Sequence, residues 1–300
     1  MIARQESHIW FNPVRHNPHV AIGGLGGSGT RVFAAMLRAA GIRLGTQLNA
    51  PLDNLWFTVL FKRADWVRQR PAAAEVAQAA DLLRRAMTTG LHGTLRPEEH
   101  TLLIRLRDTL PPNGAWKCGA RATDAESLIN SGPPSAEHGQ PWGWKEPNTH
   151  VFLTDLARYF PEMRYVHVVR NGLDMAFSGN TWQARHWGHL FLVSQHPDTP
   201  LPVRQLRYWV AANRAAIEFG TAHMPGRFMV VSYEAYCADP ERNWPRLRDF
   251  LGLPTETSLP DTLLQPTTIG RAELRDLSPF PPDLLSAARA LQAEVDGLNP

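Results

Sequence analysis

Residues 19–31 read HVAIGGLGGSGTR, a short apolar run that passes through a cluster of glycines into a helical pattern. Glycine adopts positive φ angles without steric cost, so its backbone N–H groups can press closely against an anion. The start of the following helix adds the positive end of its dipole at the same point. The chemistry that this junction predicts is the binding of a phosphate group.

Two well-known glycine-rich motifs overlap this junction, and neither fits completely. A Walker A loop fits from Gly24 to Gly29, but Thr30 occupies the position of its lysine. A dinucleotide fingerprint fits Gly24, Gly26 and Gly29, yet it requires an acidic residue about 20 positions later, and residues 45–47 (GTQ) provide none. A turn that merely joins a strand to a helix is the alternative without a function.

A second candidate for phosphate binding lies at residues 164–180, RYVHVVRNGLDMAFSGN. A β-branched strand ends at Arg170, and Ser178 follows about two helical turns later. The two side chains can meet on one side of a strand-to-helix junction, where a guanidinium and a hydroxyl can share a phosphate. Taken singly, Arg170 could equally form a surface ion pair, and Ser178 could be an ordinary helix residue.

Together, these two segments resemble the cofactor motifs of sulfotransferases that use 3′-phosphoadenosine 5′-phosphosulfate (PAPS). Residues 27–31, GSGTR, resemble the family's 5′-phosphosulfate loop at every position except the first, where the family has Lys or Arg. Residues 170–178 resemble the 3′-phosphate motif RNPxDxxxS, with Gly172 in place of the proline. Weaker likenesses to the same family follow at residues 227–234, 250–254 and 267–271.

The resemblance implies an α/β fold of the P-loop sulfotransferase type, closer to the heparan-type and bacterial enzymes than to the cytosolic phenol enzymes. It implies PAPS, or its product 3′-phosphoadenosine 5′-phosphate (PAP), as the cofactor, with no required metal. The cofactor-binding residues that it implies are Gly26, Gly27, Ser28, Gly29, Thr30, Arg31, Arg170, Ser178, Gly270 and Arg271.

Sulfuryl transfer needs a cation near the leaving oxygen, but Gly27 stands where cytosolic relatives have a loop lysine. Lys145, in the segment WGWKEP (142–147), resembles the lysine of the KTP or KSP turn in heparan-type enzymes, which implies a catalytic role. It is also one of only three lysines among 31 basic residues. The alternative is a simple ion pair with a carboxylate such as Glu146.

Asp53 is the first candidate for the base that accepts the proton of the acceptor. The segment DNLWF (53–57) partly resembles the Glu-x-His-Phe-Phe segment that carries the base in heparan-type enzymes. The alternative role for Asp53 is a helix N-cap, and Glu146 and His150 are substitute bases.

Composition limits the class of protein. The chain has 300 residues, of which 43% are hydrophobic, and its net charge of +3 is dispersed among acidic residues. These features predict a folded domain without a nucleic-acid surface. No apolar stretch is long enough to span a membrane, and the two cysteines are too few for a disulfide framework. The low cysteine count therefore predicts a cytoplasmic protein. His186 and His189 lack further metal ligands at a characteristic spacing, so we predict no metal site.

The alternation of strand-like and helical patterns predicts a parallel sheet with helices on both faces, in one domain over residues 1–300. Residues 51–140 are expected to form a helical and Pro/Gly-rich insertion near the acceptor site, although residues 72–107 look like an ordinary solvated helical pair. The predicted strands are 19–23, 42–45, 142–145, 164–169 and 228–232. The clearest predicted helices are 30–40, 72–87, 148–159 and 203–223.

The predicted function is transfer of a sulfuryl group from PAPS to a hydroxyl or amine. One alternative is a nucleotide-dependent phosphotransferase with an aberrant Walker loop, which would need Mg²⁺ and an acidic partner at a strand end. The other is a non-catalytic nucleotide-binding protein, which the glycine at position 27 motivates. Small-molecule, carbohydrate, peptide and lipid acceptors all stay open, as does the oligomeric state.

Overall fold

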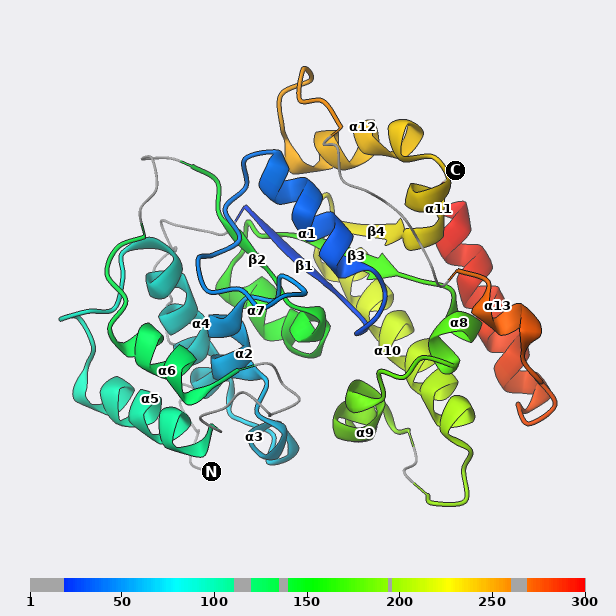
Figure 1. Ribbon diagram of the computed structural model, residues 1–300, viewed down its shortest axis with the longest axis horizontal. Helices are drawn as coiled ribbons and strands as arrows, with labels where there is room; N and C mark the ends of the chain where they lie inside the picture. Colours follow the sequence, from blue (N-terminus) through cyan, green and yellow to red (C-terminus); the bar gives the residue numbers. More distant parts are fainter. Residues whose placement is uncertain (1–18, 111–119, 135–139, 194–195, 260–268, 300) are drawn as a thin grey trace, which may run out of the picture.

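A four-stranded parallel sheet forms the centre of the protein (Figure 1). The computed structural model describes residues 19–110, 120–134, 140–193, 196–259 and 269–299. The strands are β1 (Val20–Gly24), β2 (Gly143–Lys145), β3 (Arg164–Val169) and β4 (Phe228–Ser232), in the order β2-β1-β3-β4. Because all neighbouring strands are parallel, their carboxyl ends lie at one edge, where ligands bind in open α/β folds.

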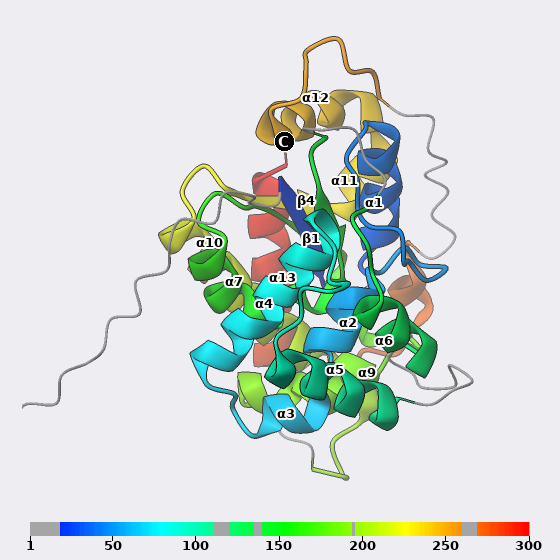
Figure 2. The same cartoon turned by 90° about the vertical axis from the view of Figure 1, so that its left-hand side faces the viewer.

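Alternate residues of the strands pack into two hydrophobic cores, one on each face of the sheet (Figures 1 and 2). Val20 and Ile22 of β1 pack in a core with α1 (Thr30–Ala39), α11 (Tyr233–Ala238) and α12 (Pro240–Leu251). Ala21 belongs to the opposite core, with helices that include α10 (Leu201–His223) and α13 (Pro282–Gly297). Burial on both faces explains why the strands read as continuous apolar runs.

Four of the five predicted strands are confirmed, and the strand predicted at 42–45 is wrong. In the structure, Arg43 forms only an isolated parallel bridge with Trp142. Gly41 and Gly45 on either side have φ angles of 88° and 112°, so the chain turns at both points and cannot extend into a strand.

The predicted helices at 30–40, 72–87 and 203–223 are also confirmed, as α1, α4 (Ala73–Thr88) and α10. The helix predicted at 148–159 differs, because it begins as a 3₁₀ helix, η1 (Pro147–Phe152), and continues as α7 (Leu153–Tyr159). No helix in the described ranges is long and apolar enough to cross a membrane. Four further short helices follow β3 in the chain, namely α8 (Gly172–Ala176), α9 (Trp182–Trp187), η2 (Gly188–Phe191) and η3 (Arg271–Leu274).

The segment between α1 and β2 is helical, as expected, and its helices gather on one side of the sheet (Figure 1). Besides α4, its described residues form α2 (Leu55–Phe61), α3 (Ala64–Arg68), α5 (Pro97–Thr109) and α6 (Ala122–Ile129). Parts of its Pro/Gly-rich passage, residues 111–119 and 135–139, lie outside the described residues.

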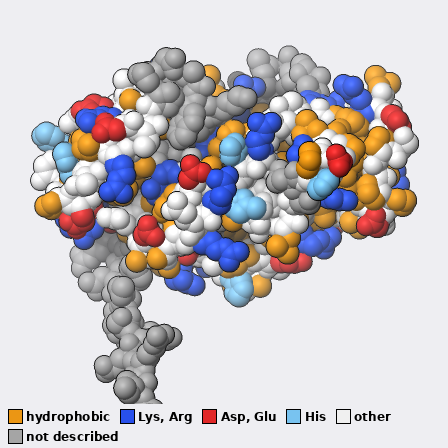
Figure 3. Space-filling model, turned by 90° about the horizontal axis from the view of Figure 1, so that it is seen from below, with side chains coloured by type: hydrophobic (Ala, Val, Ile, Leu, Met, Phe, Trp, Pro, Cys, Tyr) orange, Lys and Arg blue, Asp and Glu red, His pale blue; other side chains and the backbone are white. Residues whose placement is uncertain are grey.

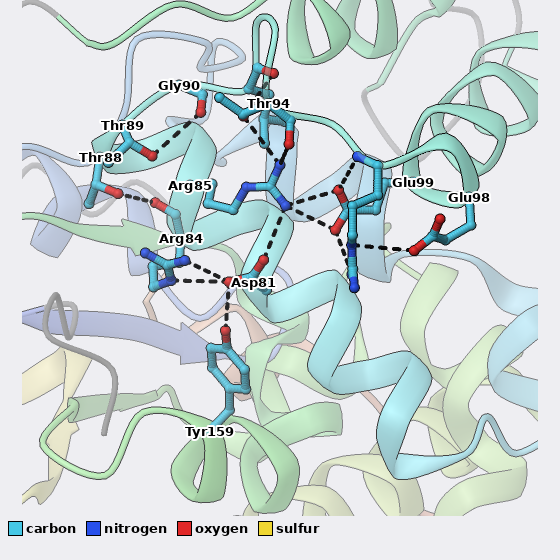
Figure 4. Close-up of polar contacts among 12 residues, drawn as sticks. Asp81, Arg84, Arg85, Thr88, Thr89, Gly90, Thr94, Glu98, Glu99 and Tyr159 are labelled. Atoms are coloured by element: carbon cyan, nitrogen blue, oxygen red, sulfur yellow. Dashed lines mark hydrogen bonds and ion pairs between the residues drawn. The ribbon is translucent and has the colours of Figure 1, made fainter. Parts of the chain in front are cut away.

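A polar network ties α4 to its neighbours (Figure 4). Asp81 accepts hydrogen bonds from Arg84 (2.7 Å) and from the Tyr159 hydroxyl of α7 (2.9 Å). Burial alone would raise the pKa of Asp81, but these bonds and one from Arg85 outweigh it and hold the pKa below its ordinary value. Arg85 also pairs at 2.9 Å with Glu99 of α5, whose side chain is buried. The network therefore joins α4 to α5 and α7 and stabilises the insertion.

The face seen from below carries Lys and Arg side chains interspersed with acidic and histidine side chains (Figure 3). On this face the charges do not form one continuous basic surface, which agrees with the mixed charges along the sequence.

Stability should fall at acidic pH because His167 of β3 is held neutral in the folded protein. Burial lowers the pKa of His167 to about 3, although its ring bonds Asn213 at 2.9 Å. The unfolded chain binds a proton near pH 6.5, so this contribution is present above that pH and is lost as the pH falls toward 3. Between pH 7 and 5 we expect His167 to account for about 2 kcal/mol of lost stability.

Urea unfolding of wild type and His167→Gln at pH 7 and pH 5 measures this contribution. The variant should lose less stability on acidification, whereas the exposed control His100→Gln should behave as wild type. Equal losses in all three proteins would contradict the assignment.

Candidate active site

The glycine-rich loop leads from β1 into α1 through a backbone that few other residues could follow. Gly24, Gly27 and Gly29 have φ angles of 145°, 101° and 90°. Gly29 is the N-cap of α1, and a Cβ atom there would lie 2.2 Å from the ring of Tyr233. The loop backbone therefore requires glycine both for its conformation and for its close packing.

Ser28 supplies a buried polar atom at the start of α1. Ser28 is only 1% exposed, and its hydroxyl has no hydrogen-bond partner among the described residues. Leaving a buried hydroxyl unpaired is costly, and the first turn of a helix such as α1 has backbone N–H groups without an intrahelical acceptor. This combination fits an anionic group bound at the loop.

Arg170 lies directly after β3 and reaches the same loop. Its Nη1 atom donates to the carbonyl oxygen of Gly27 at 3.3 Å, and its guanidinium lies 5.2 Å from the centre of the Tyr233 ring. The carboxylates of Asp174 and Glu234 lie 3.9 and 4.0 Å from it. The arginine is thus fixed beside the loop by groups on three sides.

Ser178 is the second residue of the predicted 3′-phosphate motif, and it also lies at the loop. Its hydroxyl is 3.7 Å from the position that a Cβ atom on Gly27 would take. The structure therefore brings Arg170 and Ser178 to the same glycine from opposite ends of α8. Gly172 replaces the family's proline for a visible reason, since a Cβ atom there would lie 2.7 Å from the ring of Trp209.

Asp174 connects this motif to the late loop that the sequence also predicts as cofactor-binding. Its carboxylate is 2% exposed and accepts hydrogen bonds from the N–H groups of Gly270 (2.8 Å) and Ala272 (2.9 Å). Gly270 has a φ of 79° and is the N-cap of η3, which begins at Arg271. Thr267 and Thr268 of the same resemblance lie outside the described residues.

The other predicted loop residues differ in exposure. Thr30, the first residue of α1, is buried, whereas Arg31 is exposed. The N–H of Gly26 donates to the side chain of Gln183, at 2.8 Å.

Lys145 and Asp53, predicted separately as catalytic residues, are in direct contact. Lys145 ends β2 and is 2% exposed, and its ammonium group donates to the Asp53 carboxylate and, at 2.9 Å, to the carbonyl oxygen of Pro51. Asn49 holds the other carboxylate oxygen of Asp53 at 3.0 Å. The alternative role for Lys145 is an ion pair with a carboxylate such as Glu146, and the structure does show an ion pair, with Asp53 as the partner in place of Glu146.

The alternative role of Asp53 as a helix cap is wrong. Asn54 caps α2 instead, since its side chain accepts from the N–H of Phe57 at 2.9 Å. A cap must directly precede the first helical turn, and the chain places Asn54, not Asp53, at that position. The carboxylate of Asp53 is therefore left for Lys145 and Asn49.

The two substitute bases are enclosed by their own partners. Glu146 is fully buried, and both its carboxylate oxygens accept from Asn148, at 2.6 and 2.7 Å. Burial raises the pKa of Glu146. His150 has both ring nitrogens engaged, by the carbonyl oxygen of Pro147 (2.9 Å) and the hydroxyl of Tyr208 (3.1 Å), and burial lowers its pKa to about 4. Asp53 also has a partner on each carboxylate oxygen, but its side chain is 13% exposed, whereas Glu146 is fully buried and His150 is 7% exposed.

His186 and His189 lie near the surface on α9 and η2. Within the described residues there is no group of three His, Cys, Asp or Glu side chains that could hold a metal ion. His186 instead stacks on Trp182, with 4.4 Å between ring centres.

Comparison with known proteins identifies the class. The chain matches the sulfotransferase family over residues 18–257, and it belongs to that family. A comparison with curated proteins finds no match. The parallel sheet flanked by helices and the family match confirm the predicted α/β fold of the sulfotransferase type.

Solved sulfotransferase structures are similar at low sequence identity. The sulfotransferase domain from the Synechococcus PCC 7002 olefin synthase is 16% identical, covers 94% of this chain and 98% of its own, and has a TM-score of 0.48. The sulfotransferase domain from the curacin biosynthetic pathway is 12% identical, with coverages of 94% and 99% and a TM-score of 0.49. A sulfotransferase from Alicyclobacillus acidocaldarius is 14% identical, with coverages of 94% and 93% and a TM-score of 0.47.

Asp174→Ala should destabilise the protein and loosen the late loop. The substitution leaves two backbone N–H groups without their acceptor, which we expect to cost about 2–4 kcal/mol. Urea unfolding measures the loss, and amide exchange at Gly270 and Ala272 should accelerate. Asp276→Ala, which removes an exposed carboxylate that caps Ser278, is the control and should leave both measurements close to wild type. Slow exchange at Gly270 in the Asp174 variant would contradict the anchoring role.

Proposed function

We propose that the protein transfers a sulfuryl group from PAPS to a hydroxyl or amine of an acceptor and releases PAP. The observation that carries the proposal is the convergence of Ser28, Arg170 and Ser178 on the glycine-rich loop. A buried hydroxyl without a partner just before α1, a guanidinium, and a second hydroxyl just after α8 are hydrogen-bond donors of the kind that bind the phosphates of a bisphosphorylated nucleotide.

The loop from Gly26 to Arg31 would hold the 5′-phosphosulfate with the Ser28 hydroxyl and with its other backbone N–H groups, since those of Gly26 and Ser28 donate to Gln183 and to the carbonyl oxygen of Leu25. Arg170 and Ser178 would hold the 3′-phosphate, and the late loop at Gly270 and Arg271, which Asp174 anchors beside α8, would cover it. None of these roles calls for a metal ion, because fixed N–H groups and arginines supply the positive charge.

Lys145 and Asp53 would act at the transferred group. The acceptor oxygen or nitrogen forms a bond to sulfur while the bond between sulfur and the phosphate oxygen breaks, and the released electron pair stays on PAP. Lys145 stabilises the charge that develops on this phosphate oxygen, which is the main requirement of a loose transition state. Asp53 takes the proton of the acceptor. Since Asp53 directly precedes the cap of α2, the acceptor would lie against the helical insertion.

The replacement of the loop lysine favours a non-catalytic nucleotide-binding protein as the second candidate. The loop backbone explains the replacement, because the φ of 101° at Gly27 would strain a lysine there. Lys145, at the end of the adjacent strand, offers a cation without this strain.

The proposal includes the cytoplasmic location and the small-molecule, carbohydrate or peptide acceptor that the sequence predicts.

PAP should bind without a metal ion, and Arg170→Ala should weaken its binding by about 2–3 kcal/mol through loss of a charge-assisted contact. Calorimetric titration with PAP, ATP and NAD, with and without Mg²⁺, measures the affinity and separates the cofactor classes. Arg164→Ala, at the opposite end of β3, is the matched control and should bind PAP as wild type does. Preference for ATP with Mg²⁺ would instead support a phosphotransferase, and wild-type PAP affinity in a folded Arg170 variant would remove this residue from the site.

Lys145→Ala should lower kcat by about 10² to 10³, with much less effect on PAP affinity, because the lysine acts mainly in the transition state.

Asp53→Asn keeps the size of the side chain and should lower kcat by about 10² to 10⁴ while abolishing the acidic limb of the pH–rate profile. Both are measured by transfer from labelled PAPS to the acceptor that an acceptor screen identifies.

The pH profile separates two roles for Asp53. If Asp53 only holds Lys145, the asparagine variant retains an oxygen that can accept from the ammonium group and keeps the acidic limb. Full activity of Asp53→Asn together with collapse in Glu146→Gln or His150→Gln would move the base to one of those residues.

A further inference from the structure

Gln183 of α9 joins the glycine-rich loop to a buried polar chain. Its Oε1 atom accepts from the N–H of Gly26 at 2.8 Å, and its Nε2 atom donates to Oδ1 of Asn148 at 2.7 Å. The side chain is 7% exposed, so these two bonds use its amide in one fixed orientation. The primary amide carries a separate acceptor oxygen and donor nitrogen on one planar, uncharged group, so one side chain can serve both partners at once.

The chain continues from Asn148 to the residue that follows Lys145. Asn148 is 1% exposed, and its Nδ2 atom donates to Oε1 of Glu146 at 2.7 Å. Its Oδ1 atom also accepts from the indole of Trp187 at 2.8 Å. The two ends of the chain are therefore Gly26, which precedes the phosphosulfate loop, and Glu146, which is covalently linked to Lys145.

The segment just before Gln183 connects the same loop to the 3′-phosphate motif. The N–H of Asn180 donates to the Ser178 hydroxyl at 3.2 Å. A Cβ atom on Gly26 would lie 2.6 Å from the side-chain amide of Asn180, so this segment packs directly on the loop. Residues 178–183 thus contact both regions that the proposed function assigns to the two phosphate ends of PAPS.

We propose that Gln183 is a positioning residue, which fixes the glycine-rich loop relative to Lys145 through Asn148 and Glu146. This inference rests on the proposed function, because it concerns the spacing between the donor site and the catalytic lysine. Gly26 and Gly27 have no side chains of their own to hold the loop, so a bond to the N–H of Gly26 supplies the restraint from outside. Fixing the donor against the lysine before transfer lowers the cost of ordering them later.

Gln183→Leu removes both hydrogen bonds at similar volume and should weaken PAP binding about tenfold, the factor expected for one lost buried hydrogen bond. Amide exchange in the peptide that contains Gly26 should accelerate in the same variant. Trp187→Phe is the matched control, since it removes the other donor to Asn148 but leaves the bond to Gly26 intact. It should retain wild-type PAP affinity and wild-type exchange at Gly26.

Gln183→Glu tests the direction of the two bonds. The ionised carboxylate can accept from Gly26 but faces the oxygen of Asn148, whereas the protonated acid can again accept on one side and donate on the other. Compared with wild type at the same pH, PAP affinity should be about tenfold weaker at pH 8 and recover to within about threefold at pH 5. If the side chain at position 183 only filled space, PAP affinity of Gln183→Glu would not recover between pH 8 and pH 5.

The outcomes separate this inference from the proposed function. Wild-type protein that fails to bind PAP would overturn both. Wild-type binding together with normal affinity and normal exchange in folded Gln183→Leu, or an affinity of Gln183→Glu that does not recover at low pH, would overturn the positioning role alone.

Discussion

Close approach of the glycine-rich loop to the ends of β3 and β4 is the constraint on which the rest of the site depends. A Cβ atom on Gly24 would lie 2.3 Å from the carbonyl oxygen of Val168, and one on Gly29 would lie 2.2 Å from the ring of Tyr233. Any side chain at these positions would push the loop away from the sheet. Because the loop stays close, Arg170 at the end of β3 reaches the carbonyl of Gly27 without leaving its own strand-to-helix turn. The side chains that we propose as phosphate ligands thus converge because the glycines allow this close approach.

Two carboxylates, the buried Asp174 and the partly buried Glu234, hold the segments around this loop by accepting hydrogen bonds from backbone N–H groups. Asp174 accepts from the late loop, and Glu234 accepts from the N–H of Asn171 at 3.0 Å. Each carboxylate also forms an ion pair with Arg170, at 3.9 Å for Asp174 and 4.0 Å for Glu234. Burial raises the pKa of Glu234, and the bond from Asn171 and the charge of Arg170 act in the opposite direction. A buried acid is tolerated here because it has both N–H donors and a cation, so the same groups order the backbone and orient the arginine.

Local patterns predict the parts of this structure that depend on sequence neighbours. The strands around Ile22 and Val166 and the long helix α10 follow from apolar runs and helical periodicity, and the family motifs point to Arg170 and Ser178. The strand expected at 42–45 is absent because flanking glycines turn the chain, which periodicity does not register. Contacts between distant segments were not predictable, since nothing near Gln183 indicates Asn148 or Gly26 as its partners. Tyr233 and Glu234 lie in a segment of weak family resemblance, and only the fold shows that they pack beside Arg170 and the loop.

The pairing of Lys145 with Asp53 connects the glycine at position 27 to the base that we propose. Lys145 is almost fully buried, and a buried ammonium group is costly unless a carboxylate faces it. Asp53 provides that carboxylate, so moving the cation from the loop to the end of β2 also brings an acid to the same point. In such a low-dielectric setting, a fixed charge acts more strongly on a developing oxyanion than it would in water. A lysine placed in the exposed loop at Gly27 would be solvated and would need no such partner. The burial of Lys145 therefore accounts for the acidic residue at its side, and it would strengthen the electrostatic effect that we propose for this lysine.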